Sequence, residues 1–481
     1  MDTAWQSSEA RFVAYVESLA QSLGHVDRAR PLKDYCTGLL MPGERKSVEP
    51  MAAVVAPSRV SAAHQSLLHF VGQASWSDAA MLGKVRERVV PAIEAQGGPI
   101  EAWIVDDTGF AKKGVHSVGV ARQYRGRLGK TDNGKTDNCQ IAVTLCIANH
   151  AASLPIAYRL YLPQDWAKDA ARRAKAHVPE DVKFKTKPQI ALGQIRAALA
   201  TGVGKGVVLA DAAYGTNGAF RAGLTRMGLS YAVGVQSNVG AWAPGVEPLP
   251  PGEWSGRGRP PTRLRRDAAR KPVPVKTLAM GLPAEVWEDV TWREGSNAAL
   301  TSRLAAVRVR PASREGDPTK LPAVEWLLVE WPQGAVAPTK YWFSTLPEDT
   351  PLATLVDTAK LRWRIERDYE ELKSELGLAH FEGRGWRGFH HHATLCIAAY
   401  GFLIRERAEI PPCGAGRREK PGLSQRPRPR GAANPAGAAR RKLDRHDAAQ
   451  THRRARQNAA TMSVLPVNQA EITLSSAFMT Q

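Results

Sequence analysis

Apolar residues in the first 95 positions recur at the spacing of helix turns. One such stripe comprises Leu67, Leu68, Phe70 and Val71. A second helical run starts after Ser77 and Asp78, a pair typical of a helix N-cap. Residues 1–95 are therefore predicted to form a helical N-terminal domain.

The hydrophobic period changes after residue 100. Short apolar runs bounded by turn residues are typical of buried strands. Five runs fit this description, at 101–106, 115–124, 139–148, 153–162 and 206–211, and a helix is predicted at 188–200. Further strand-like runs lie between 229 and 345, where a segment rich in Pro, Gly and Arg interrupts them.

Helical spacing returns after Pro351. Residues 352–376 carry an apolar stripe that would seat a helix on a core, formed by Leu361, Ile365, Leu372 and Leu376. A further helix is predicted at 390–408, and beyond 410 the chain is rich in Arg, Ala, Pro and Gly without apolar periodicity, which indicates disorder. The predicted domains are 1–95, 96–235, 236–345 (a β-rich insertion), 346–410 and the basic tail 411–481.

The net charge of the chain indicates what kind of partner it binds. The 481 residues carry a net charge of +20, and residues 413–458 hold thirteen Lys and Arg against three acids. An excess of this size indicates a polyanion such as nucleic acid, although a basic tail on a mildly basic body is the simpler alternative. The N-terminus lacks the features of a signal peptide and no apolar run would cross a bilayer, so a cytoplasmic location without membrane contact is expected.

Candidate chemistry begins with carboxylates that follow predicted strands. Asp106 and Asp107 follow one strand, and Asp211 follows another. On the helix predicted at 352–376, Glu366 lies within about a 60° arc of Arg362 and Lys373. Three carboxylates with adjacent cations suit a Mg²⁺ site acting on phosphodiesters, because hard cations take oxygen ligands and leave positions for phosphate.

Each of these features also has a simpler interpretation. Aspartates after strands often form turns or cap helices, which applies to Asp106, Asp107 and Asp211 alike. Glu366 between two basic residues could be part of a solvated ion-pair ladder. The order and spacing of the three blocks favour a common site more than any one block does.

The blocks "DDT", "LADAAYG" and "LRWRIERDYEELK" resemble the three signature blocks of insertion-sequence transposases of the DDE superfamily. The last block resembles the family pattern Tyr-x2-Arg-x3-Glu-x6-Lys, in which Arg362, Glu366 and Lys373 stand at the right intervals. Ala359 occupies the Tyr position, so one contact to the DNA end is in doubt. The family pattern Asp-x-Thr favours Asp106 as the first ligand, with Asp107 as the alternative.

The resemblance implies an RNase-H-like α/β catalytic domain with a β-rich insertion and a helical N-terminal DNA-binding domain. It implies cleavage at transposon ends and strand transfer into target DNA. Two Mg²⁺ ions, with Mn²⁺ as a substitute, would be held by Asp106 or Asp107, Asp211 and Glu366. A homodimer on paired terminal repeats, associated with the bacterial nucleoid, is expected.

Several further residues are candidates for DNA contact. Arg362 and Lys373 would bind phosphates, and Trp363 would hold a flipped base, with a core Trp as the alternative. Lys112 and Lys113 follow the first aspartates closely, and Arg257 and Arg259 belong to "GRGRPP", which resembles an AT-hook core or is simply a basic loop. The run His390–His392 is predicted to start a helix near DNA, because three consecutive residues cannot face one metal.

Two rival functions remain open at this stage. One is a nuclease of the same fold that hydrolyses DNA without joining it. The other is a DNA-binding protein with an inactive relict site, which the tandem repeat "GKTDNGKTDN" and the unusual tail would fit.

Overall fold

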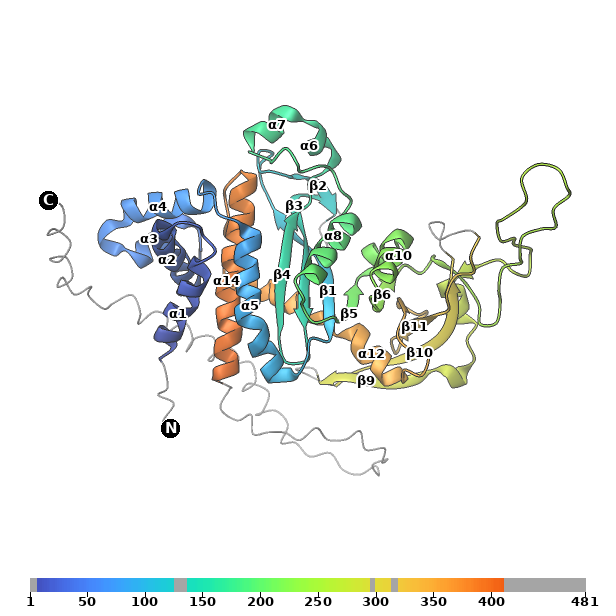
Figure 1. The fold of residues 1–481 in the computed structure, drawn as a ribbon. Coiled ribbons are helices and arrows are strands. Elements are labelled where there is room, and N and C mark those ends of the chain that lie inside the picture. The colour runs from blue at the N-terminus through green and yellow to red at the C-terminus, as the bar shows by residue number, and fades with distance from the viewer. Residues whose placement is uncertain (1–6, 125–135, 295–298, 313–318, 411–481) are drawn as a thin grey trace, which may run out of the picture.

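The protein is built around one large mixed sheet with helices on both faces (Figure 1). The structure, a computed structural model, describes residues 7–124, 136–294, 299–312 and 319–410. The predicted tail and most of the "GKTDN" repeat lie outside the described residues. None of the described helices is long and apolar enough to cross a membrane.

The half of the sheet that belongs to the predicted catalytic domain, called the catalytic half, has five principal strands, in the order β4, β3, β1, β5, β6. Their bounds are β1 (Ala102–Ala111), β3 (Thr136–Ala148), β4 (Ser153–Leu160), β5 (Val207–Ala210) and β6 (Tyr231–Val235). β3 pairs antiparallel with β1 and β4, whereas β1, β5 and β6 run parallel. A short strand, β2 (Ala121–Tyr124), pairs with the start of β3 on the same edge as β4. This is the predicted RNase-H-like α/β arrangement.

The β-rich insertion continues the same sheet. β12 (Lys340–Ser344) pairs antiparallel with β6, so the strand order runs on from the catalytic half without a break. The remaining strands of the insertion are β7 (Gly240–Trp242), β8 (Val273–Pro274), β9 (Glu288–Glu294), β10 (Ala299–Pro311) and β11 (Glu325–Trp331). A helix, α11 (Val275–Met280), lies among them. Because β12 leads directly into the next helix, the insertion is anchored at both of its ends.

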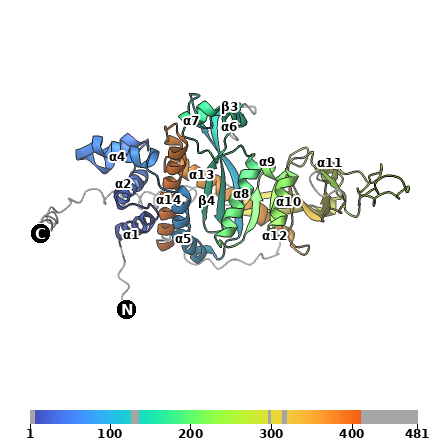
Figure 2. The ribbon, with the colours of Figure 1, turned by 45° about the horizontal axis from the view of Figure 1, so that its top comes forward.

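Helices surround the catalytic half. The N-terminal helices are α1 (Ser8–Ala20), α2 (Ala29–Leu40), α3 (Val48–Val55), α4 (Val60–Gly72) and α5 (Asp78–Gly97). The others are α6 (Gln164–Lys168), α7 (Ala170–Lys175), α8 (Lys187–Ala200), α9 (Ala212–Gly215), α10 (Gly218–Arg226), α12 (Leu352–Lys360), α13 (Trp363–Ser374) and α14 (Trp386–Glu409). Figure 2 shows α14 between α1–α4 and the sheet, with α5 packed alongside it. α14 is buried along most of its length because it packs on both.

Two element predictions need correction. Residues 115–124 form a strand only from 121, because Gly119 adopts a left-handed backbone (φ +71°) and Val120 closes a turn onto Ser117. The helix predicted at 352–376 breaks after Lys360 and restarts at Trp363. Its apolar stripe is nevertheless buried, as predicted.

The prediction for His390–His392 is wrong. All three side chains are buried within α14; His391 and His392 contact the N-terminal region, whereas His390 accepts a hydrogen bond from the Leu160 amide of β4 at 3.2 Å. His391 stacks on Trp76 with ring centroids 3.6 Å apart, and the Tyr35 hydroxyl lies 2.9 Å from Nδ1 of His392. The sequence pattern missed this because imidazole can satisfy its nitrogens against backbone carbonyls inside a core.

Because of these buried histidines, we expect the stability of the protein to depend on pH. Burial lowers the pKa of His391 and of His392 to about 4. Between that value and the ordinary pKa near 6.5, the unfolded chain binds more protons, so the free energy of unfolding falls as the pH drops. The expected loss is about 2 kcal/mol per histidine at pH 5.

Thermal denaturation between pH 7.5 and pH 5 measures this effect. His391→Gln should flatten the dependence of Tm on pH, whereas His116→Gln, at an exposed position, should leave it unchanged. An unaltered pH dependence in the His391 variant would contradict the assignment.

Candidate active site

The register of β1 and β5 brings two aspartates together. The two strands run parallel, and their last paired residues are Val105 and Ala210. Asp106 and Asp211 come next on each strand and therefore lie beside one another, since neighbouring strands are about 4.8 Å apart. Contrary to the prediction, Asp106 does not end its strand, because β1 continues to Ala111 along β3.

Asp106 and Asp107 point to opposite faces of the sheet, as successive strand residues do. Asp107 accepts a hydrogen bond from the Tyr214 hydroxyl and forms an ion pair with Lys187, 2.6 Å from Nζ to Oδ2. Asp106 instead forms an ion pair with Arg362 at 2.7 Å. Only Asp106 thus faces the helix that carries Glu366.

Arg362 joins the sheet to this helix. It stands at the break between α12 and α13, as the N-cap residue of α13. One guanidinium nitrogen contacts Asp106, and the other contacts Glu366 at 2.7 Å. Asp106 and Arg362 are 256 residues apart in the sequence. An isolated surface ladder would account for the contact within the helix but not for the contact with the sheet.

Asp211 has a second role at the same place. It is the N-cap residue of α9, and its Oδ1 accepts a hydrogen bond from the Ala213 amide at 2.9 Å. The simpler interpretation of Asp211 as a helix cap therefore holds alongside its position next to Asp106. One carboxylate can do both, because it has a second oxygen.

The electrostatics of the site reflect crowded negative charge. Burial raises the pKa of Asp106 to about 6, Arg362 opposes this shift, and Asp211 adds to it. Burial also raises the pKa of Asp211. Burial lowers the pKa of Arg362, but Asp106, Glu366 and Asp211 outweigh it and raise that pKa. The guanidinium therefore acts as the shared counter-ion of these carboxylates.

The carboxylates surround an arginine and do not form a closed metal cage. Within the described ranges, no three His, Cys, Asp or Glu side chains stand close enough together to hold one ion. The donor chemistry nevertheless fits a hard divalent cation, because all the donors are carboxylate oxygens. Among the described ion pairs, Arg362 pairs with Asp106 and Glu366, and Lys187 pairs with Asp107. With Asp211, which is in no described ion pair, four carboxylates stand against these two cations. One divalent cation would neutralise the negative charge that remains.

Three of the predicted DNA-contacting residues lie toward the far end of β1, beyond Asp106, and differ in exposure. Lys373 donates to the carbonyl of Gly109 at 2.9 Å, and Lys112 donates to that of Phe381 at 2.8 Å. Burial lowers the pKa of Lys112. Lys113 is exposed. The first two side chains thus help to fix the end of β1, while the third faces solvent.

Trp363 is neither a core residue nor freely exposed. Its ring lies between the guanidinium groups of Arg293, at 4.2 Å, and Arg364, at 4.9 Å. Because Arg293 belongs to β9, the insertion reaches the helix of Glu366 at this point. Ala359, at the family's Tyr position, is buried in α12.

Arg257 and Arg259 are exposed on the long loop between β7 and β8. This loop projects from the side of the insertion that lies away from α1–α4 (Figure 1). The structure therefore separates these two residues from the carboxylates.

Two residues at the site were missed from the sequence. Tyr214 lies in the "LADAAYG" block, so its spacing from Asp211 was a usable signal. Lys187 had no such signal, because it belongs to a lysine-rich segment in which no one residue stands out. Together they hold Asp107 on the opposite face from Arg362.

Comparison with known proteins shows which family the chain belongs to. Residues 18–299 match the family described as DDE superfamily endonuclease, which is more than half of the chain, and the protein belongs to this family. The match includes Asp106, Asp107 and Asp211 and ends before Glu366. The resemblance to the DDE superfamily is therefore confirmed.

One curated relative is named as a probable transposase. The chain is 32% identical over 196 residues to the probable transposase for insertion sequence element IS701 of Microchaete diplosiphon. The alignment covers 40% of this chain and 46% of that relative. The chain thus matches about half the length of that transposase.

Proposed function

We propose that this protein is a transposase of an insertion sequence, which cleaves DNA at the ends of its element and joins them to target DNA. The observation that carries this proposal is the meeting of Asp106 and Glu366 on one guanidinium, with Asp211 beside them. The superfamily generally uses divalent metals, and the family match and the similarity to an insertion-sequence transposase support the proposal.

Asp106, Asp211 and Glu366 are the residues that would hold two Mg²⁺ ions, or Mn²⁺ in their place. When bound, such ions activate the attacking oxygen and stabilise the leaving oxygen of a phosphodiester. Asp107 would contribute indirectly, because its contacts with Lys187 and Tyr214 fix the backbone that carries Asp106. Arg362 would leave the carboxylates and bind a DNA phosphate, for which a guanidinium fork is well suited.

If metal ions replace the Arg362 guanidinium at the carboxylates, removing that guanidinium should strengthen metal binding. Arg362→Gln should bind Mn²⁺ more tightly in the absence of DNA, because the carboxylates no longer have a competing cation. Loss of the two ion pairs of Arg362, worth about 1 kcal/mol each, corresponds to roughly a tenfold or larger increase in Mn²⁺ affinity. Free Mn²⁺ measured by electron paramagnetic resonance reports this affinity directly.

Arg367→Gln is the matched control, since Arg367 is on the same helix and pairs only with Glu371 among the described ion pairs. Its Mn²⁺ affinity should equal that of the unaltered protein. Equal or weaker binding by the Arg362 variant would show that the guanidinium does not compete with metal.

The remaining contacts belong to the same proposal. Lys373, Lys113 and Trp363 would meet DNA close to the carboxylates, and Lys112 would support the end of β1. Arg257 and Arg259 would meet DNA farther away, and the N-terminal helices would read the terminal repeat. A homodimer would hold two ends, and the protein would act in the bacterial cytoplasm, at the nucleoid.

A gel assay with labelled ends separates this function from its rivals. Purified protein, Mg²⁺ and the DNA flanking its own gene should give nicked ends and, later, strand-transfer products. Nicks without joined products would favour a nuclease of the same fold. Binding without nicks would favour a relict site.

A further inference from the structure

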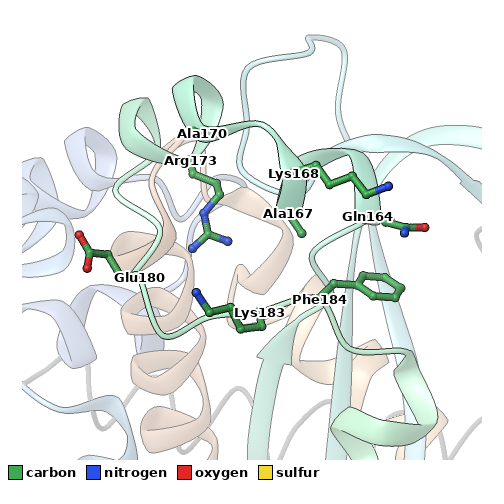
Figure 3. Close-up of a pocket in the computed structure, with 8 residues that line it drawn as sticks. All are labelled: Gln164, Ala167, Lys168, Ala170, Arg173, Glu180, Lys183 and Phe184. Carbon is green, nitrogen blue, oxygen red and sulfur yellow. The ribbon is translucent and has the colours of Figure 1, made fainter.

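A basic hollow lies near Tyr161 and Lys187, on the side of the sheet where Lys187 contacts Asp107. It has a volume of about 490 Å³ and is open to solvent. It is formed by α6, α7 and the segment that leads from them toward α8 (Figure 3). Its lining consists of Gln164, Ala167, Lys168, Ala170, Arg173, Glu180, Lys183 and Phe184.

Two cations face each other across this hollow. Figure 3 shows the Arg173 guanidinium and the Lys183 ammonium directed toward one another, while the Glu180 carboxylate turns away from both. Within the part of the chain that the structure describes, neither cation has an ion-pair partner. Like charges in this arrangement repel, and an anion between them would relieve the repulsion.

The position of Arg173 is fixed before any ligand arrives. Its guanidinium donates to the carbonyl of Val182 at 2.8 Å and to that of Pro179 at 2.9 Å. These bonds leave the positive charge in place, because the acceptors are neutral. A preorganised cation binds an anion at a smaller entropic cost than a freely moving one.

A set of contacts joins the hollow to Asp107, the carboxylate that lies on the opposite sheet face from Arg362 and Glu366. The Phe184 ring meets Tyr161 with centroids 6.4 Å apart, and the Lys187 ammonium lies 5.7 Å from the Tyr161 ring. Lys187 in turn contacts Asp107. Lys183 and Lys187 are four residues apart, a separation of at most about 14 Å. One DNA strand carries a charge about every 3.4 Å of helix axis, so DNA bound at the carboxylates offers phosphates within this reach.

We propose that the hollow binds a backbone phosphate of the DNA strand a few nucleotides from the cleaved bond. The inference rests on the proposed function and adds to it a path for the DNA, which leaves the face of Asp106, passes the adjacent Asp107 and Lys187 and continues to Lys183 and Arg173. Phe184, which is 38% exposed at the rim, offers a ring face to the adjoining sugar or base.

The test compares Lys183→Gln and Arg173→Gln with Lys205→Gln. Lys205 is exposed and precedes β5, at the opposite end of that strand from Asp211. The dependence of DNA affinity on salt is measured with a duplex from the flank of the gene. Each hollow variant should lower the slope of log K against log salt by about 1, while Lys205→Gln leaves it unchanged.

Phosphate ethylation interference on the same duplex locates the contact. The unaltered protein should require a phosphate a few nucleotides from the nick, and Lys183→Gln should lose that requirement alone. Unchanged slopes and an unchanged pattern in Lys183→Gln, with normal DNA binding by the unaltered protein, would overturn the inference and leave the proposed function standing. Failure of the unaltered protein to bind DNA would overturn both.

Discussion

Replacing Asp211 by Asn is expected to abolish DNA cleavage while DNA binding persists. The substitution removes one negative charge beside Asp106, where the metal ligands are proposed to converge. Loss of a single electrostatic group at a reaction centre typically costs about 10²–10³ in rate, and a direct ligand lies at the upper end of that range. Nicking of a labelled duplex and its electrophoretic mobility shift are the two measurements.

This variant carries its own structural control. Asn is as good a helix N-cap as Asp, so the hydrogen bond from the Ala213 amide should be retained. A circular dichroism spectrum and a Tm close to those of the unaltered protein should confirm the fold. Cleavage that survives in the Asn variant would remove Asp211 from the catalytic residues.

The second large effect concerns the neighbouring pair Asp106 and Asp107. Asp106→Asn should lose cleavage by about 10²–10³, since Asp106 faces Arg362 and the helix of Glu366. Asp107→Asn should keep metal-dependent cleavage. It should instead lose about 1–3 kcal/mol of stability, because Lys187 and Tyr214 lose their charged partner.

Parallel measurements of nicking rate and denaturant midpoint on the two variants decide between the aspartates. The expected pattern is an inactive, stable Asp106 variant and an active, less stable Asp107 variant. The reverse pattern would make Asp107 the first ligand and would require the sheet face that carries Lys187 to be the catalytic one.

Much of this fold follows from local sequence patterns. Runs such as Trp103–Val105 are continuous and apolar, which predicted buried strands, whereas the RNase-H-like arrangement was implied by the resemblance to DDE transposases. The apolar stripe through Ile365 and Leu372 predicted which face of the helix is buried. Local patterns suffice here because burial on one or both faces dictates residue type at each position.

Features that depend on distant partners could not be predicted in this way. β1 runs past Asp106 because β3 pairs with it as far as Ala111. The helix break at Arg362 has no proline or glycine to mark it, and it coincides with the arginine's contact to the sheet. The insertion was expected as a β-rich segment, but its junction to β6 depends on pairing between residues more than a hundred positions apart.

The central claim is that Asp106, Asp211 and Glu366 together bind the divalent ions that act on DNA. Anomalous X-ray diffraction from crystals containing Mn²⁺ tests it most directly. The account predicts manganese density bounded by oxygens of these three carboxylates, with Arg362 turned away from them. Manganese bound elsewhere, or none between these carboxylates at a concentration that supports cleavage, would contradict it.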